Sequence, residues 1–213
     1  MSVLPKVLID CQVFPPPAFF AWMLEGRLLI ETCEHYQKRS SRNRFWIRGA
    51  GRERCLSIPL CKGKNDHLPI REVCISYDHS WVRTMLSSLA AAYGRAPFYL
   101  FYKDELAELF HARQKYLFDF NCSTHQWLAA QLNIPYNVEY TMQYQHQPDE
   151  GILDLRGASL DWMDHSQQIE NAERRYGELS SLHLLFHEGP EALGSILRWQ
   201  TNYHNEYRNH RSA

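Results

Sequence analysis

The sequence predicts an α/β protein with a small mixed sheet, an N-terminal strand-helix-strand unit and a largely helical second half; α+β is the alternative class. Two short apolar runs near the N-terminus enclose a helical stretch, an order typical of parallel strand pairing. Two further apolar runs flank a glycine-rich segment, which indicates a hairpin. Beyond residue 80 the apolar residues recur mostly at helical spacing. One hydrophobic core can serve 213 residues, so we expect a single domain spanning residues 1–213.

The first unit begins with the branched apolar run at residues 7–9, which suits a buried strand. The prolines at 15–17 then fix the entry into a helix over residues 18–25. Gly26 can close that helix, because glycine adopts the conformation that ends many helices. Residues 28–31 follow as the second strand.

The next part of the chain has the pattern of an antiparallel hairpin. Residues 45–47 and 55–60 are apolar runs on either side of the turn Gly49-Ala50-Gly51. Residues 70–75 fit a third strand in this region.

Helices are expected after the hairpin. Apolar residues recur at helical spacing from Trp81 to Ala92, where Ser80 or Asp78 can cap the start and Gly94 can end the helix. Residues 103–114 and 123–132 are further helices, and the second opens with the capping-box pair Ser123 and Gln126.

The last third is less regular. Alternation of apolar and polar residues over 138–145 predicts a strand with one buried face, whose aromatic residues we interpret as core rather than as a stacking surface for a base or sugar. Residues 149–162 read as a loop, 179–199 as one or two helices, and 202–213 as a frayed polar tail.

Composition excludes several classes of function. Hydrophobic residues make up 45% and charged residues 22%, as in folded soluble proteins. The formal net charge is -1, so no global basic field would bind nucleic acid, and any anion site must be local. No run approaches the ~20 apolar residues that span a bilayer, and polar residues interrupt the N-terminus where a signal peptide would be apolar. We therefore expect a cytoplasmic protein with no membrane span.

The sequence does not indicate a metal site or a particular cofactor. The six cysteines are scattered singly, which favours buried structural thiols over zinc ligands or disulfides. His183 and His187 would share one helical face, but no third ligand is evident. Cys33 precedes His35 by two residues, yet nothing supplies an oxyanion hole for a thiolate nucleophile.

The best candidate site is the polar segment from Glu34 to Arg44, which we call the 34–44 segment. It carries four cations, two serine hydroxyls, amides and an imidazole directly after the second predicted strand. Ligands of open α/β sheets bind at the carboxyl ends of strands, and Lys and Arg there can neutralise phosphate or carboxylate groups. A small phosphorylated or carboxylated ligand therefore fits. The alternative is a solvated loop whose charges keep a strand edge soluble.

The order of residues in this segment resembles the central motif of the WbqC-like family. An aromatic residue at Tyr36 is followed by Lys38, Ser40 and then Asn43-Arg44. The similarity continues in register over nearly the whole chain, through Leu56-Ser57-Ile58-Pro59-Leu60, Ile75-Ser76-Tyr77-Asp78, Trp81, Tyr93, Ala96-Pro97-Phe98-Tyr99, Phe120-Asn121, Asp154-Leu155-Arg156, Leu184-Leu185-Phe186 and Glu188-Gly189-Pro190. The family is named from bacterial surface-polysaccharide (O-antigen) gene clusters and has no securely assigned reaction.

This resemblance implies a transferase in surface-polysaccharide or nucleotide-sugar metabolism, for example one that moves an acyl or aminoacyl group onto an amino sugar. His35 or Glu34 would move a proton during the reaction. The residues expected to contact the ligand are Tyr36, Lys38, Ser40, Arg42, Asn43, Arg44, Asp154 and Arg156. For Asp154 and Arg156, a structural ion pair is an equally good interpretation.

Some positions depart from the family pattern. Met85 stands where relatives tend to carry His, and His183 stands where they carry Asp. The Pro-Lys expected shortly after Arg156 is replaced by Leu160-Asp161-Trp162. These changes favour the alternative function, a ligand-binding or scaffolding protein of the same family without turnover.

Overall fold

The computed structural model describes residues 5–49, 51–61, 65, 68–157 and 179–211, with side chains described up to residue 201. At its centre is a parallel sheet in the order β5-β2-β1-β6. Its strands are β1 (Lys6–Asp10), β2 (Leu28–Glu31), β5 (Glu139–Tyr140) and β6 (Ile152–Asp154). An antiparallel hairpin of β3 (Arg44–Gly49) and β4 (Arg52–Ser57) forms a second sheet. The α/β class is confirmed, but the parallel and antiparallel strands lie in two sheets rather than in one mixed sheet.

The N-terminal strand-helix-strand unit is confirmed. β1 and β2 pair in parallel with Asp10 beside Glu31 at their carboxyl ends. Between them α1 (Pro17–Leu24) begins at a proline and buries nearly all of its side chains. Gly26 follows with a φ of +63°, a left-handed conformation that favours glycine and turns the chain into β2.

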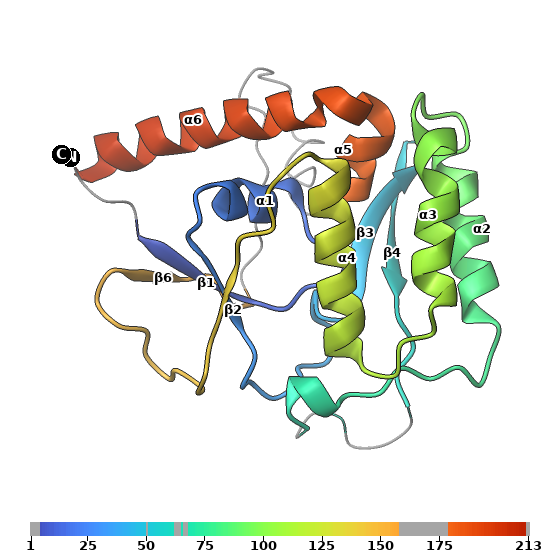
Figure 1. Ribbon diagram of the computed structural model, residues 1–213, viewed down its shortest axis with the longest axis horizontal. Helices are drawn as coiled ribbons and strands as arrows, with labels where there is room; N and C mark the ends of the chain where they lie inside the picture. The colour runs from blue at the N-terminus through green and yellow to red at the C-terminus, as the bar shows by residue number, and fades with distance from the viewer. Residues whose placement is uncertain (1–4, 50, 62–64, 66–67, 158–178, 212–213) are drawn as a thin grey trace.

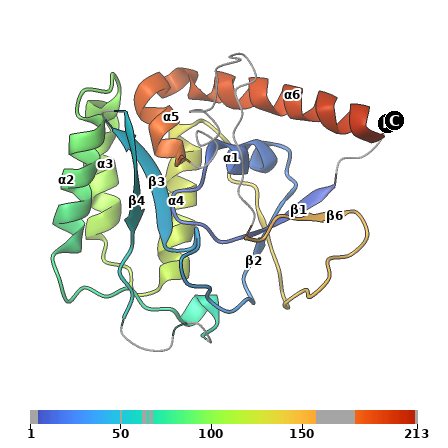
Figure 2. The same ribbon diagram turned by 180° about the vertical axis from the view of Figure 1, so that it is seen from behind.

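The helices lie above the parallel sheet and around the hairpin in the view of Figure 1. They are α2 (Trp81–Tyr93), α3 (Tyr99–His111), α4 (Leu117–Gln131), α5 (Ser181–Glu188) and α6 (Ala192–Arg211). The view from behind shows α2 and α3 beside the hairpin and α6 passing over α1 (Figure 2). Because α6 continues to Arg211, it takes in most of the tail expected to be irregular. None of the described helices is long and apolar enough to cross a membrane.

Two helices begin earlier than the sequence predicts. α3 begins at Tyr99 rather than near residue 103, and α4 begins at Leu117 rather than at Ser123. Ser123 lies within α4, where its hydroxyl donates to the carbonyl of Asp119, so the capping-box interpretation is wrong. The start of α4 is fixed by a tertiary contact instead, since the Leu117 N–H donates to the Val73 carbonyl.

The prediction of a strand over residues 70–75 is also wrong. Ile70–Glu72 form one turn of 3-10 helix after Pro69. Ile70 and Val73, three residues apart, are both fully buried. A turn buries side chains at this spacing together, whereas a strand would send them to opposite faces.

Within the alternating region at 138–145, only Glu139–Tyr140 pair with a neighbouring strand, β2. The face that was expected to be buried is partly exposed. Met142 is 93% exposed and Tyr144 is 43% exposed. The strand stops because Thr141 turns toward β2, where its hydroxyl accepts from the Thr32 N–H and its carbonyl accepts from the Thr32 hydroxyl. In the expected loop, Ile152–Asp154 instead add a strand beside β1; residues 158–162 of that loop lie outside the described part.

Candidate functional site

Three neighbouring strands of the parallel sheet end at one edge with acidic side chains. Asp10 ends β1, Glu31 ends β2 and Asp154 ends β6. The first two are fully buried. Buried carboxylates need partners, because an uncompensated charge is costly away from water. Two arginines supply them.

Arg42 pairs with carboxylates from two different segments. Its Nε donates to Oε1 of Glu34 at 2.7 Å, and its Nη2 donates to Oε2 of the same carboxylate. Its Nη1 lies 3.5 Å from Oδ2 of Asp10. Burial raises the pKa of the Glu34 carboxyl, while the hydrogen bonds from Arg42 act in the opposite direction. This triad closes the 34–44 segment onto the end of β1.

Asp10 also holds two loops. Its Oδ2 accepts from the Ser41 hydroxyl at 2.7 Å, and its Oδ1 accepts from the Gly157 N–H at 3.0 Å. Ser41 belongs to the loop after β2 and Gly157 to the loop after β6. One buried carboxylate thus sets the relative position of both loops.

The second arginine, Arg156, joins β6 to β2. Its Nε and Nη2 donate to the two oxygens of Asp154 at 3.0 and 2.7 Å, and its Nη1 donates to Glu31 at 3.1 Å. The hydrogen bonds from Arg156 lower the pKa of the Asp154 carboxyl. This geometry favours a structural ion pair between Asp154 and Arg156 over direct contact of the two residues with a ligand.

Helix α4 holds the loop after β1 and the 34–44 segment in place through two side chains that no sequence pattern indicated. Asn121 Nδ2 donates at 2.8 Å to the carbonyls of both Cys11 and Arg42, so one buried amide ties the loop after β1 to the 34–44 segment. His125 Nε2 donates at 2.5 Å to the carbonyl of Gln12. Burial lowers the pKa of His125 to about 4, which keeps the ring neutral at physiological pH.

A pocket of about 400 Å³ lies next to these buried ion pairs. It opens between the loop after β1, the 34–44 segment and the β3–β4 hairpin. It is lined by Gln12, Val13, Phe14, Pro15, Pro16, Gln37, Lys38, Arg39, Ser40, Ser41, Arg44, Phe45, Trp46, Cys55 and Gly157. The lining residues that the structure describes include three cations and no carboxylate. We call it the cationic pocket. The expected ligand contacts Lys38, Ser40 and Arg44 all lie in it.

Two of the lining residues adopt left-handed backbone conformations that are uncommon outside glycine. Phe14 has a φ of +43° and Arg39 a φ of +58°. The Phe14 N–H donates to the Thr124 hydroxyl on α4 at 3.3 Å, and the neighbouring Val13 N–H donates to the Ser41 carbonyl. Strained backbone of this kind persists only where surrounding contacts hold it, and it is concentrated at ligand sites.

The other expected site residues lie outside the lining that the structure describes, and their expected roles stay predictions. Arg42 and Glu34 are buried together below the pocket. Tyr36 and Asn43 hydrogen-bond to each other at 2.9 Å, and Asn43 also donates to the Ile58 carbonyl, so both brace the segment against the hairpin. His35 is exposed and pairs through its backbone with Pro69. The expected proton carriers are thus absent from the pocket wall as described.

The two helical histidines lie elsewhere. The rings of His183 and His187 are 4.4 Å apart between centroids, and both contact Tyr93 on α2. Burial, together with the charges of His187 and Arg48, lowers the pKa of His183 to about 4. Among the described residues no three histidine, cysteine or acidic side chains gather as metal ligands would.

Comparison with known proteins adds one match. A model of the WbqC-like protein family fits residues 11–211, nearly the whole chain. No curated protein and no solved structure matches the chain.

Proposed function

Because the chain belongs to the WbqC-like protein family, we propose that its cationic pocket binds a small phosphorylated or carboxylated ligand as part of a transfer reaction in surface-polysaccharide or nucleotide-sugar metabolism. The observation that carries the proposal is the placing of Lys38, Arg39 and Arg44 around one pocket at the carboxyl edge of a parallel sheet. This edge is where open α/β sheets bind ligands.

The electrostatics of the pocket favour an anion. Among the described residues its wall holds three cations and no carboxylate, while the acidic side chains below it are paired with Arg42 and Arg156. Guanidinium groups bind phosphate and carboxylate through two parallel hydrogen bonds, and a lysine adds a point charge. The Ser40 and Ser41 hydroxyls line the same wall. Their single hydroxyl protons are donated to the Gln37 carbonyl and to Asp10, so the three cations provide the contacts to an anionic oxygen.

Transfer of an acyl or aminoacyl group to an amino sugar is the specific version we favour. The phosphate or carboxylate of the donor would sit against Arg44 and Lys38. The amine of the acceptor would attack the activated carbonyl, and the carbon–nitrogen bond would form as the bond between the carbonyl carbon and the leaving group breaks. The anionic leaving group would keep the bonding electrons and stay bound to the cations, while a base removes the amine proton.

A second candidate function is ligand binding without turnover. It is favoured by the placement of His35 and Glu34, since neither lines the pocket and Glu34 is bound bidentately by Arg42. The transferase and the non-catalytic binding protein both need the same anion site. Anion binding can therefore be tested first, and turnover then distinguishes the two functions.

Thermal unfolding in the presence of phosphate, pyrophosphate, nucleotide sugars, acyl-coenzyme A and ATP tests the site. At least one anion should raise the melting temperature of the wild type, and the shift should be lost in Arg44→Ala and Lys38→Ala. Arg54→Ala is the matched control, because Arg54 lies exposed on the same hairpin outside the pocket. Loss of the shift in all three variants, or no shift with any anion, would refute the anion site. Product formation, followed by mass spectrometry, then distinguishes transferase from binding protein.

A further inference from the structure

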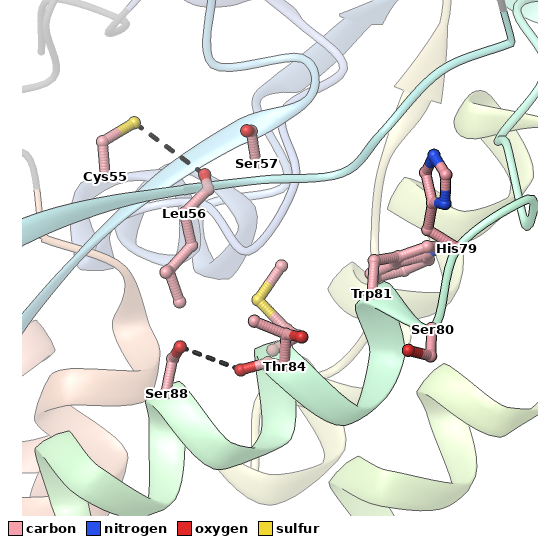
Figure 3. Close-up of a pocket in the computed structure, with 9 residues that line it drawn as sticks. Cys55, Leu56, Ser57, His79, Ser80, Trp81, Thr84 and Ser88 are labelled. Atoms are coloured by element: carbon pink, nitrogen blue, oxygen red, sulfur yellow. Dashed lines mark hydrogen bonds between the residues drawn. The ribbon is translucent and has the colours of Figure 1, made fainter.

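A second pocket adjoins the cationic pocket along the hairpin. In the β3–β4 register Arg44 faces Ser57 and Trp46 faces Cys55. Cross-strand partners have their side chains on the same face of a sheet, so these four side chains form one continuous surface. Cys55 lines both pockets. The two pockets therefore meet at Cys55, and the second pocket continues around the edge of β4 to the side on which Leu56 extends toward α2 (Figure 3).

The second pocket has a volume of about 340 Å³ and lies between β4 and the first half of α2 (Figure 3). In Figure 3 Leu56 extends from the strand toward Thr84 and Ser88 on the helix, while His79 and Trp81 stand together where the helix begins. The pocket is lined by Cys55, Leu56, Ser57, His79, Ser80, Trp81, Thr84, Met85 and Ser88. Unlike those of the cationic pocket, the described lining residues include no Lys, Arg, Asp or Glu.

The backbone of β4 contributes polar groups to this pocket. The Ile58 N–H donates to the Asn43 carbonyl, so Asn43 and Ile58 form a hydrogen-bonded pair of the antiparallel strands. Hydrogen-bonded and non-hydrogen-bonded pairs alternate from there along the hairpin. By the alternation of that ladder, Phe45 and Leu56 form a hydrogen-bonded pair, and the N–H and C=O groups of Cys55 and Ser57 point away from β3. The corresponding groups of β3 are covered, since Ser180 donates to the Trp46 carbonyl. The outer edge of β4 is thus a row of donors and acceptors beside the pocket.

Several side-chain donors are also available there. Ser80 is the N-cap residue of α2, yet its hydroxyl makes no capping hydrogen bond. Trp81 Nε1 is buried and has no hydrogen-bond partner among the described residues. That nitrogen is closed to solvent, so the donors open to a ligand are the hydroxyls of the exposed lining residues Ser57, Ser80 and Thr84. Leu56, Met85 and the Trp81 ring supply apolar area between the donors.

We propose that this second pocket binds an uncharged polyhydroxylated ring, that is, a sugar. A sugar hydroxyl is both donor and acceptor, which matches serine and threonine hydroxyls and an open strand edge, while the C–H face of the ring packs on apolar and aromatic side chains. A phosphate or carboxylate would meet no lysine or arginine among the described lining residues, and a cation would meet no carboxylate there. A purely apolar ligand would leave the donors unsatisfied.

The two pockets together fit a sugar that carries an anionic group, with the ring against α2 and the anion against Arg44. This link between the pockets rests on the proposed function. The sugar site itself does not, because none of its lining residues except Cys55 belongs to the cationic pocket.

Ligand-observed NMR with glucose, galactose and N-acetylglucosamine tests the sugar site, and calorimetry with glucose 1-phosphate and inorganic phosphate tests the link. Ser88→Leu fills the pocket with a residue that favours helix. Ser87→Leu is the control, since Ser87 is an exposed neighbour on the same helix and lies outside the lining. Thr84→Leu is a second filling variant. Circular dichroism confirms the fold of each.

At least one sugar should give saturation transfer with wild type and Ser87→Leu and lose it in Ser88→Leu and Thr84→Leu. Glucose 1-phosphate should bind wild type at least about tenfold more tightly than phosphate, because two linked groups bind cooperatively. That advantage should vanish in Ser88→Leu while phosphate affinity is kept. Phosphate binding without any sugar signal, or sugar signals unchanged by both filling variants, overturns the sugar site but not the anion site. Sugar binding without phosphate binding supports the sugar site and refutes the proposed anion function.

Discussion

Acid should destabilise the protein through His125. The ring is fully buried and its pKa is lowered from an ordinary 6.5 to about 4, because burial disfavours the imidazolium form. The unfolded chain therefore binds a proton between pH 6.5 and 4 that the folded chain does not bind. By linkage, the stabilisation from the neutral ring is fully present above pH 6.5 and is lost as the pH falls through this window. A lowering of this size corresponds to roughly 3 kcal/mol.

Urea unfolding, followed by circular dichroism at pH 7.0, 6.0, 5.0 and 4.5, measures this effect. Wild type and His125→Gln are compared, since a glutamine amide can still donate toward the Gln12 carbonyl and does not titrate. The variant should lose less stability than the wild type between pH 7.0 and 4.5, by about 2 to 3 kcal/mol. An equal loss in both proteins would refute the reasoning. If the variant does not fold, NMR titration of the His125 ring in the wild type decides, and a pKa near 6.5 would contradict the burial argument.

Three further predictions concern contacts around the site, each measured by urea unfolding at pH 7. Arg42→Met should destabilise the fold by about 3 to 5 kcal/mol, because it leaves the buried carboxylate of Glu34 without its partner; a loss below about 1 kcal/mol would contradict the pairing. Asn121→Ala removes two buried hydrogen bonds and should cost about 2 to 4 kcal/mol, and it should also weaken phosphate binding, since the two loops it joins line the cationic pocket; unchanged phosphate affinity would show that the tie does not shape the pocket. Glu139→Gln should change stability by less than about 1 kcal/mol, because its ion pair with Lys6 is exposed, and a larger loss would contradict the screening argument.

The strands of the N-terminal unit were predictable because their signals are local. Residues 7–9 and 28–30 are continuous apolar runs that follow Pro5 and Gly26 by two residues, and buried parallel strands have this composition. The beginning of α4 was not predictable in this way. It depends on a bond from Leu117 to Val73, and no residue pattern near Ser123 reveals that contact.

Part of the candidate site could be predicted from position alone. Lys38, Ser40 and Arg44 line the cationic pocket, as expected of polar residues that follow a parallel strand. Arg42 has the same local signal but is buried, because the carboxylates of Glu34 and Asp10 capture it. The sequence shows that residue 42 is charged, but it does not show whether the side chain turns into the core or into the pocket.

The supports on α4 could not be assigned from sequence because their partners are distant along the chain. Asn121 bonds to the Cys11 carbonyl 110 residues away, and His125 bonds to the Gln12 carbonyl 113 residues away. Asn121 lies in a stretch that resembles the family pattern, yet its role as a tie between two loops required the fold.

Isothermal calorimetry with inorganic phosphate and pyrophosphate tests the anion site most directly. One of the two should bind the wild type, and Arg44→Ala should weaken that binding by about 10- to 100-fold, since a hydrogen bond to a charged group contributes about 1.5 to 3 kcal/mol. Arg54→Ala, on the same hairpin, should bind as the wild type does. Equal affinities for wild type and Arg44→Ala would contradict the claim that the cationic pocket at the carboxyl edge of the sheet holds the anion.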